Sequence, residues 1–227
     1  MRKLAAIGIA GLTIAMGGAV ALAAAVRTES ATEQPGLHPG SKKHPQGVKL
    51  STTFGWSGLS RSGKVRATGF DLWFPRGSQY NGARYPKCSE GRLARGGPAA
   101  CPPGSIMGTG SGVAYASTAI TRPKMTVVNG GANEVFFYTV LNNPARVREP
   151  VVGRVKRVGG KFVYHLSVKI PKNLQIVAGT PITLTSLHIA VGRSKWLAIT
   201  QAPAGIKVGT TYSNGFSTSY LVWVQDS

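Results

Sequence analysis

Residues 150–170 read PVVGRVKRVGGKFVYHLSVKI, and this stretch decides the fold class. Apolar and polar residues alternate on both sides of Gly159-Gly160, and such alternation is typical of half-buried β-strands. Because glycine accepts the positive φ angles of a two-residue turn, the stretch predicts an antiparallel hairpin that turns at this pair. In that register Arg154 lies opposite His165.

The predicted hairpin has two unlike faces. One face is mostly apolar and should cover a core. The other face collects basic side chains and one imidazole, namely Arg154, Lys156, Lys161, His165 and Lys169. Such a face could bind an anionic partner, or it could be the ordinary solvated side of a sheet. The sequence leaves both interpretations open.

The same pattern runs from Val48 to the C-terminus. Strands are expected at 48–54, 64–74, 105–118, 124–129, 134–141, 150–158, 161–170, 182–191, 195–200, 206–212 and 219–225. A short helical turn is expected around Glu90 to Leu93. A β-bulge is expected near Thr185-Ser186, where the apolar parity changes. Short strands without long helices predict an all-β fold, most simply a single antiparallel β-sandwich domain over residues 47–227.

The N-terminus predicts export. Arg2 and Lys3 precede an apolar run that ends in Ala23-Ala24-Ala25, which is an A-x-A cleavage pattern. Residues 1–25 are therefore expected to be a signal peptide, with an uncleaved membrane anchor as the alternative. Residues 26–46 lack apolar periodicity and are expected to be a flexible linker. The expected location is secreted or extracellular, with association to the cell wall.

Cys88 and Cys101 are the two cysteines of the chain. Two thiols in an exported protein most simply form one disulfide. The enclosed loop is rich in glycine, so the bond should pin an irregular excursion onto the β-domain. A metal site is disfavoured because no second Cys or His pair stands at ligand spacing, and no cofactor is expected.

Prolines, glycines and the two cysteines form an ordered pattern over residues 70–114. Its members are Pro75, Gly77, Asn81, Pro86, Cys88, Ala100, Cys101, Pro102, Ser105, Gly108 and Gly110. The pattern resembles that of an uncharacterised family of secreted β-rich actinobacterial proteins. The resemblance implies a secreted, disulfide-pinned β-domain and supplies no catalytic residues. Gly112 replaces the last alanine of the pattern, and the further C-terminal cysteine of the family is missing here.

The charge is strongly lopsided. The chain has 27 Lys and Arg against 7 Asp and Glu, a formal net charge of +20. Loss of Arg2 and Lys3 with the signal peptide would leave 20 − 2, or +18. Such a surface attracts polyanions in a salt-dependent way, so anionic wall polymers or lipid head groups are candidate partners and a specific nucleic acid is not. Solubility alone is the other interpretation of the charge.

Catalytic motifs are scarce. The chain has no G-x-S-x-G elbow and no S-x-x-K motif. A glycosidase would need two of the carboxylates Asp71, Glu134 and Glu149 in one cleft. The GTGSG run at 108–112 is expected to permit tight strand packing. His165 is expected to be an exposed or hydrogen-bonded sheet residue.

Aromatic residues offer a weaker signal. Trp73 lies in an apolar strand and is expected in the core. Trp196 has Arg193 and Lys195 as neighbours, so it could stack on an anionic sugar at a sheet edge, or it could also be core.

The sequence therefore predicts a non-enzymatic secreted protein of the cell envelope that binds anionic polymers. The binding residues would be Arg154, Lys156, Lys161, His165, Lys169 and Trp196. A carbohydrate-active or other hydrolytic enzyme on a β-scaffold is one alternative. A structural or protein-interaction module is another.

Overall fold

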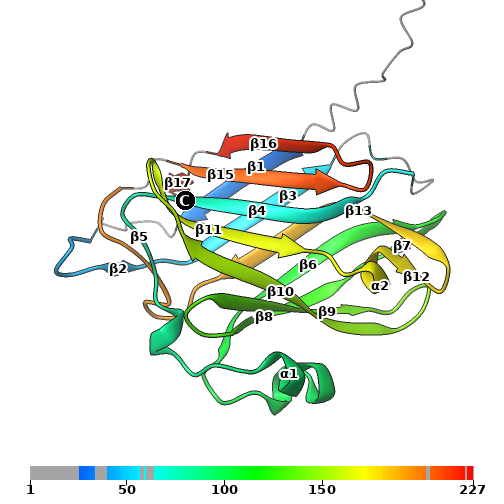
Figure 1. Cartoon of the computed structure of the whole chain (residues 1–227), viewed down its shortest axis with the longest axis horizontal. Coiled ribbons are helices and arrows are strands. Elements are labelled where there is room, and N and C mark those ends of the chain that lie inside the picture. The colour runs from blue at the N-terminus through cyan, green and yellow to red at the C-terminus, as the bar shows by residue number, and fades with distance from the viewer. Residues whose placement is uncertain are drawn as a thin grey trace, which may run out of the picture.

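The structure, a computed structural model, describes residues 26–33, 40–56, 59, 64–202, 205–222 and 224–226, the first and last of these as backbone only. The expected signal peptide at residues 1–25 lies outside the described residues. The fold is all-β and antiparallel, with the layers of a curled sandwich and one Cys88–Cys101 disulfide (Figure 1). The predicted fold class is therefore confirmed.

One large sheet contains most of the strands. They are β1 (Val26–Glu33), β3 (Leu50–Trp56), β4 (Ala67–Pro75), β6 (Ile106–Ala116), β7 (Ala119–Thr121), β8 (Lys124–Asn129), β9 (Glu134–Leu141), β10 (Val147–Arg157), β11 (Phe162–Lys169), β12 (Ile176–Val177), β13 (Thr180–Val191), β15 (Ile206–Tyr212), β16 (Ser217–Val222) and β17 (Val224–Asp226). A small second sheet contains β2 (Gln46–Gly47), β14 (Leu197–Ile199) and β5 (Ser78–Tyr80).

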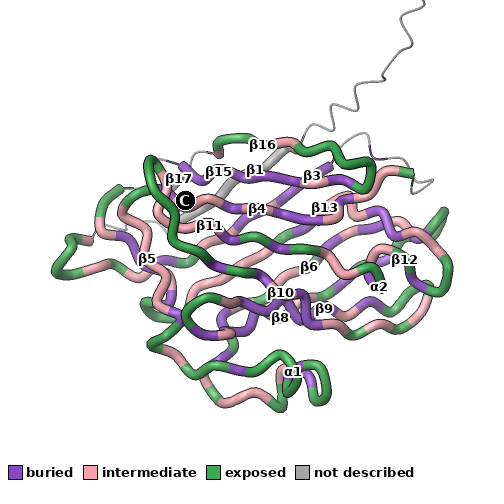
Figure 2. Tube along the Cα trace, in the orientation of Figure 1, coloured by how far each residue is buried: buried purple, intermediate pink, exposed green. Residues whose placement is uncertain are grey.

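The large sheet curls until its two ends approach each other. Its strand order is β16-β15-β4-β11-β10-β9-β8-β6-β13-β3-β1-β17, and every neighbouring pair is antiparallel except β1–β17. The curl brings β16 close to β1 (Figure 1). It also places β3 against β4 across the core, where the rings of Phe54 and Phe70 lie 6.0 Å apart. Figure 2 shows that buried residues concentrate on the central strands, whereas the turns, α1 and the edge strand β16 are mostly exposed.

The hairpin of β10 and β11 forms as predicted, but its register differs. Arg154 pairs with Ser167, and His165 pairs with Lys156 rather than with Arg154. The connection is longer than the two-residue turn because the β10–β11 strands end at Arg157 and resume at Phe162. A shift of two residues keeps every side chain on its predicted face, because strand side chains alternate with that same period.

The predicted linker contains a strand. Residues 26–33 form β1, which pairs with β3 along its length, so the linker prediction is wrong for these residues. Their sequence, VRTESATE, lacks apolar alternation. Backbone hydrogen bonds to the free edge of β3 nevertheless suffice to form a ladder, since a ladder needs no particular side chain.

The disulfide holds an excursion against the outer side of the sheet. It encloses α1 (Glu90–Gly96) and the short helix η2 (Pro98–Ala100), which agrees with the helical turn expected near Glu90. The Ser89 hydroxyl caps α1 by accepting a hydrogen bond from the Arg92 backbone N–H. Leu93 of α1 is fully buried among residues of β8, β9 and β10. We call this outer surface the covered face; it consists of Val128, Phe136, Tyr138 and Val152.

The glycines of β6 allow it to approach β13 closely. A Cβ atom at Gly110 would lie 2.8 Å from the His188 carbonyl oxygen, and one at Gly112 would lie 2.9 Å from that of Ser186. The register of the same pair shifts between Leu184 and Ser186, which is the predicted β-bulge. Tight strand packing, as expected for the GTGSG run, is therefore confirmed.

The remaining helices are short. They are η1 (Gly82–Arg84) and α2 (Lys172–Gln175). Throughout the described part of the chain, no helix has the length and apolar character needed to cross a membrane.

Candidate basic sheet face

The predicted basic residues share the outer side of β10, β11, β4 and β15, beside the covered face. We call this surface the open face, because no element packs over it within the described residues. Its outward side chains are Arg154, Lys156, His165, Ser167, Lys169, Asp71, Trp73 and Lys207. The inward neighbours on the same strands, such as Val155 and Leu166, are buried in the core.

Four of these side chains form a single row across the strands. Lys156 pairs with His165, His165 with Trp73, and Trp73 with Lys207. Adjacent strands lie about 4.8 Å apart, so the row is about 14 Å long. It presents a cation at each end and two aromatic rings in the middle.

Trp73 lies at the centre of the row. Its ring stacks on His165, with the ring centroids 4.6 Å apart and the planes within 2°. The Lys207 ammonium lies 4.7 Å from the same indole, which is a cation–π distance. A Cβ atom at Gly209 would lie 3.0 Å from the indole, so this glycine leaves the space that the ring occupies. The prediction that Trp73 is core is therefore wrong: it is half-buried on the outer face.

Asp71 fixes the His165 ring. The Nε2 atom of His165 lies 2.6 Å from the Asp71 Oδ1 atom, and each side chain is 24% exposed. Within the described residues, His165 makes no hydrogen bond to a hydroxyl or a thiol. The pair therefore orients an imidazole against Trp73.

The acids of this face are separated and already paired. Glu134 accepts a hydrogen bond from Arg154 at 3.2 Å. Register places Glu134 and Asp71 in one row, but with β10 and β11 between their strands. Three strand spacings amount to about 14 Å, whereas glycosidase carboxylates stand about 5–9.5 Å apart. Glu149 binds the Asn173 amide instead. The three carboxylates named by the sequence therefore do not form a catalytic pair.

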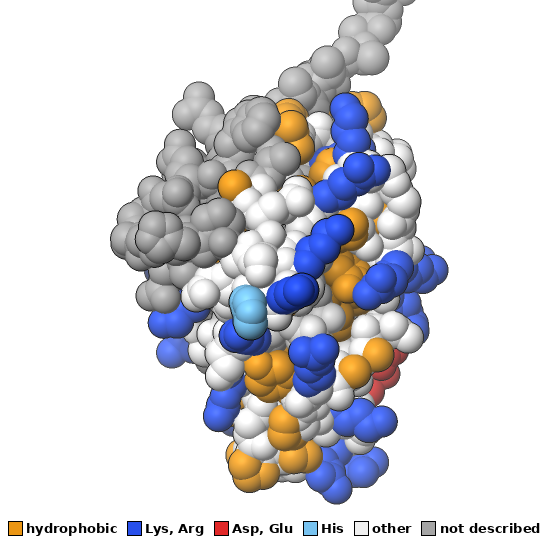
Figure 3. All heavy atoms as spheres, turned by 90° about the vertical axis from the view of Figure 1, so that its left-hand side faces the viewer, with side chains coloured by type: hydrophobic (Ala, Val, Ile, Leu, Met, Phe, Trp, Pro, Cys, Tyr) orange, Lys and Arg blue, Asp and Glu red, His pale blue; other side chains and the backbone are white. Residues whose placement is uncertain are grey.

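The structure brings most of the predicted binding residues together. Arg154, Lys156 and Lys169 are exposed on the open face, and Lys161 is exposed in the adjoining turn. Figure 3 views the end of the molecule that carries this turn, and Lys and Arg side chains extend over its full height while acidic ones show at a single spot.

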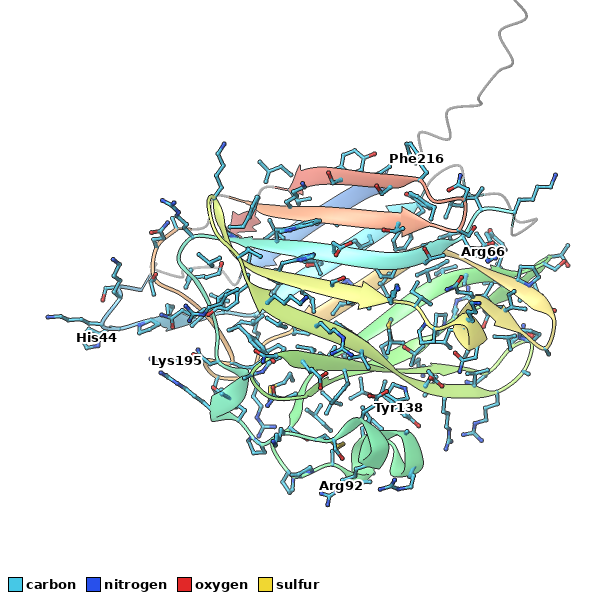
Figure 4. The ribbon with its side chains drawn as sticks, viewed as in Figure 1. His44, Arg66, Arg92, Tyr138, Lys195 and Phe216 are labelled. Atoms are coloured by element: carbon cyan, nitrogen blue, oxygen red, sulfur yellow. A yellow bond between two sulfur atoms is a disulfide. The ribbon has the colours of Figure 1, made fainter. Side chains whose placement is uncertain are left out.

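Trp196 does not belong to this face. It is 3% exposed and packs in the main core, so the prediction of an exposed stacking residue is wrong. Its neighbour Lys195 lies at the end of the molecule, labelled in Figure 4. Trp196 forms an edge contact with the Tyr80 ring, whose centroid lies 5.4 Å away. The basic neighbours Arg193 and Lys195 suggested that Trp196 would be exposed. They lie in a turn, where the in-and-out alternation of a strand does not determine which side chains are buried.

A buried asparagine, missed by the sequence analysis, holds this end of the molecule together. Asn129 is fully buried, and its amide donates to the carbonyl oxygens of Gly82, Tyr85 and Pro86 at 2.9, 3.1 and 3.1 Å. Its Oδ1 atom accepts from the Trp196 indole at 3.1 Å. The network therefore ties the disulfide excursion to the core.

Tyr80 extends the same network. Its hydroxyl donates to the backbone oxygens of Gly131 and Glu134 at 2.7 and 2.9 Å. Burial raises the pKa of Tyr80 above its ordinary value of 10.0, and the nearby Glu134 charge raises it further. Tyr80 is consequently neutral at physiological pH.

Over the described parts of the chain, no three His, Cys, Asp or Glu side chains gather closely enough to hold a metal ion. Comparison with protein-family models gave no match, and neither the curated proteins nor the solved structures gave one. Function must therefore be inferred from the geometry and chemistry of the chain itself.

Proposed function

We propose that this protein is a non-enzymatic binding protein that is exported and associates with anionic polymers of the cell envelope through its open face. The observation that carries the proposal is the row Lys156, His165, Trp73 and Lys207, with Arg154 and Lys169 beside it. Exposed cations in a line suit a ligand whose negative charges repeat along a chain.

The two acids on the face support this interpretation. Asp71 is engaged by His165, and Glu134 by Arg154, so Lys156, Lys169 and Lys207 have no carboxylate partner within the described residues. Their positive field therefore extends into solvent. Lys207 has a long flexible stem, so its ammonium can bind a phosphate or carboxylate while its methylenes cover the indole.

Export is supported by two independent features. The Cys88–Cys101 bond is formed, with its Cα atoms 5.3 Å apart, and such bonds persist in oxidising compartments. The N-terminal sequence carries the features of a signal peptide.

The test is retention on isolated bacterial cell wall across a salt series, with heparin as a defined polyanion. The variant Lys156→Gln/Lys207→Gln removes two charges from the row. The control Lys87→Gln/Arg92→Gln removes two exposed charges from the excursion, where Arg92 points away from the sheet (Figure 4). We expect the row variant to weaken binding about tenfold and to lower the salt slope by about two, because each phosphate-type contact releases about one counterion.

Equal loss in the two variants would show that net charge alone governs binding and would overturn the assignment of the face. Absence of retention at low salt would overturn the proposed function as a whole.

A further inference from the structure

Two cavities lie inside the curled sheet. Each has a volume of about 100 Å³. Both are lined by Phe54, Leu72, Phe137 and Ile189, so they adjoin one another across these four side chains. They are two neighbouring apolar spaces between the layers of the sandwich, with these side chains as their common wall.

The lining leaves little for water to bind. The cavity nearer β5 has Thr52, Ser78 and Gln79 as polar residues among aliphatic and aromatic ones. The cavity nearer α2 has Thr139 and Gln175, and the Thr139 hydroxyl is satisfied by the Phe137 carbonyl oxygen. Apolar cavities of this kind stay dry and accept apolar ligands.

A cation lies beyond one end of these cavities, outside the lining of either one. Along β10 the inward positions run Val151, Gly153, Val155 and Arg157, since strand side chains alternate. Val151 lines the cavity nearer α2 and Val155 lines the other, so Arg157 is the next inward position beyond them. Arg157 is exposed, and its guanidinium lies 5.4 Å from the ring of Tyr164, which lines the cavity.

The opposite end, next to α2, lies near an acidic side chain instead of a basic one. Leu174 of α2 lines that cavity, and the adjoining Asn173 donates to the Glu149 carboxylate at 2.8 Å. An anionic group would therefore be favoured near Arg157 and disfavoured near Glu149. At the Arg157 end the lining residues Phe74 and Tyr164 are half-buried.

We infer that the interior binds a medium-chain fatty-acid-like amphiphile, with its alkyl chain along the two cavities and its carboxylate at Arg157. A dry cavity of about 150 Å³ holds the six carbons of benzene, so the two cavities of about 100 Å³ each would together hold about eight carbons once the side chains between them move aside. This site lies on the inner side of the sheet and is independent of the polymer-binding face proposed above.

The test is calorimetric titration of the purified protein with sodium octanoate, compared with hexanoate, dodecanoate and octyltrimethylammonium. Each methylene buried contributes about 0.8 kcal/mol, which is about fourfold in affinity. We expect octanoate to bind about tenfold more tightly than hexanoate, dodecanoate to gain little more, and the cationic probe to bind about tenfold more weakly.

Two variant pairs locate the ligand. Ile189→Phe fills the junction of the cavities and should abolish octanoate binding, whereas Ile120→Phe, at a side chain 47% exposed, should not change it. Arg157→Gln should weaken octanoate binding about tenfold, and Arg148→Gln, an exposed arginine of the same strand, should leave it unchanged.

Three outcomes would overturn the inference: absence of octanoate binding at millimolar concentration, affinity independent of chain length, or full binding by Ile189→Phe. The chain-length series uses the natural protein, so it decides the matter even where a variant fails to fold. Equal binding of the cationic probe would overturn the role of Arg157.

Discussion

The covered face and the open face are two outer regions of one sheet, and their sequences differ as their environments do. Strand β9 reads EVFFYTVL and shows no alternation, because Val135 and Phe137 face the core while Phe136 and Tyr138 face α1. Strand β11 alternates, with Leu166 and Val168 inward and polar residues outward. A continuous apolar run therefore marked a strand buried on both sides.

The two regions also differ in how their polar groups are hydrogen-bonded. Beside the covered face, on the core side of β8, the fully buried Asn129 has its hydrogen-bond partners within the protein. On the open face the polar groups are part-exposed or exposed, and water competes for them. Substitutions should therefore lower the stability strongly in the buried network and only slightly on the open face.

The largest effect is expected at Asn129. Replacing it with Ala leaves three carbonyl oxygens and the Trp196 N–H without their partner in a buried site. We expect the free energy of unfolding to fall by about 3–5 kcal/mol in urea denaturation. The exposed Asn133→Ala is the matched control and should change stability by less than about 0.5 kcal/mol. A loss of similar size in both variants would show that the buried hydrogen bonds of Asn129 do not cause the loss of stability.

The next effect is that of the disulfide. Cys88 and Cys101 are separated by 13 positions, and opening a loop of this length costs about 3 kcal/mol in the chain-entropy account. The variant Cys88→Ser/Cys101→Ser should also uncover Phe136 and Tyr138, and so bind more of an apolar fluorescent dye than the natural protein does. Unchanged dye binding with reduced stability would show that α1 stays docked without the bond.

Tyr80, which belongs to the Asn129 network, gives the stability of the protein a pH signature. Burial raises its pKa above 10.0, so the unfolded chain ionises first as pH rises. The stability contributed by neutral Tyr80 is complete below pH 10.0 and is lost above it, by at most about 1.4 kcal/mol per pH unit. Tyr80→Phe should cost about 1–2 kcal/mol at neutral pH and should flatten this alkaline slope. Parallel slopes in the two proteins would assign the alkaline loss to other groups.

On the open face, Gly209 is the position with the largest expected effect. A side chain there would meet the Trp73 indole at about 3 Å, so Gly209→Val should turn the ring away from His165. We expect a cost of about 1–2 kcal/mol and a change in near-UV circular dichroism. Thr211→Val, on the same face of β15, should leave the spectrum unchanged.

The smallest effect is expected for the ion pair between Arg154 and Glu134. Their side chains are 67% and 37% exposed, and pairs of this kind contribute about 0.5 kcal/mol or less. A double-mutant cycle with Arg154→Ala and Glu134→Ala should measure that coupling. A coupling energy well above about 1 kcal/mol would mean that the open face is covered in solution.

Local patterns predicted much of the fold. The strands at 124–129, 134–141 and 206–212 have the expected bounds, because alternation and flanking turn residues act over short distances. The register of the β10–β11 hairpin was wrong, since a slip of two residues leaves the face pattern intact. The missed strand β1 depends on an edge supplied by β3, which composition does not reveal.

The candidate site was predicted in part. Trp73 could have been placed outside, because it shares the parity of Asp71 on a strand whose alternate residues are apolar. The role of Asn129 could not, since its partners lie 43 to 67 residues away in the chain. The resemblance to secreted actinobacterial proteins stays a prediction.

The Asn129 network also determines which asparagines of the protein deamidate with time. Asn129 precedes Gly130, and an asparagine before glycine loses ammonia readily when the next backbone nitrogen attacks its amide carbon. Here that nitrogen donates to the Glu134 oxygen at 3.0 Å, and the amide itself is held on three carbonyl groups. In the exposed turn Asn214-Gly215 the Gly215 nitrogen also donates, to the Tyr212 oxygen at 3.0 Å, but within the described residues the side-chain amide nitrogen of Asn214 is held by no carbonyl group. Aspartate should therefore accumulate at position 214 before it does at 129, and its slow appearance at 129 would record each opening of the buried network.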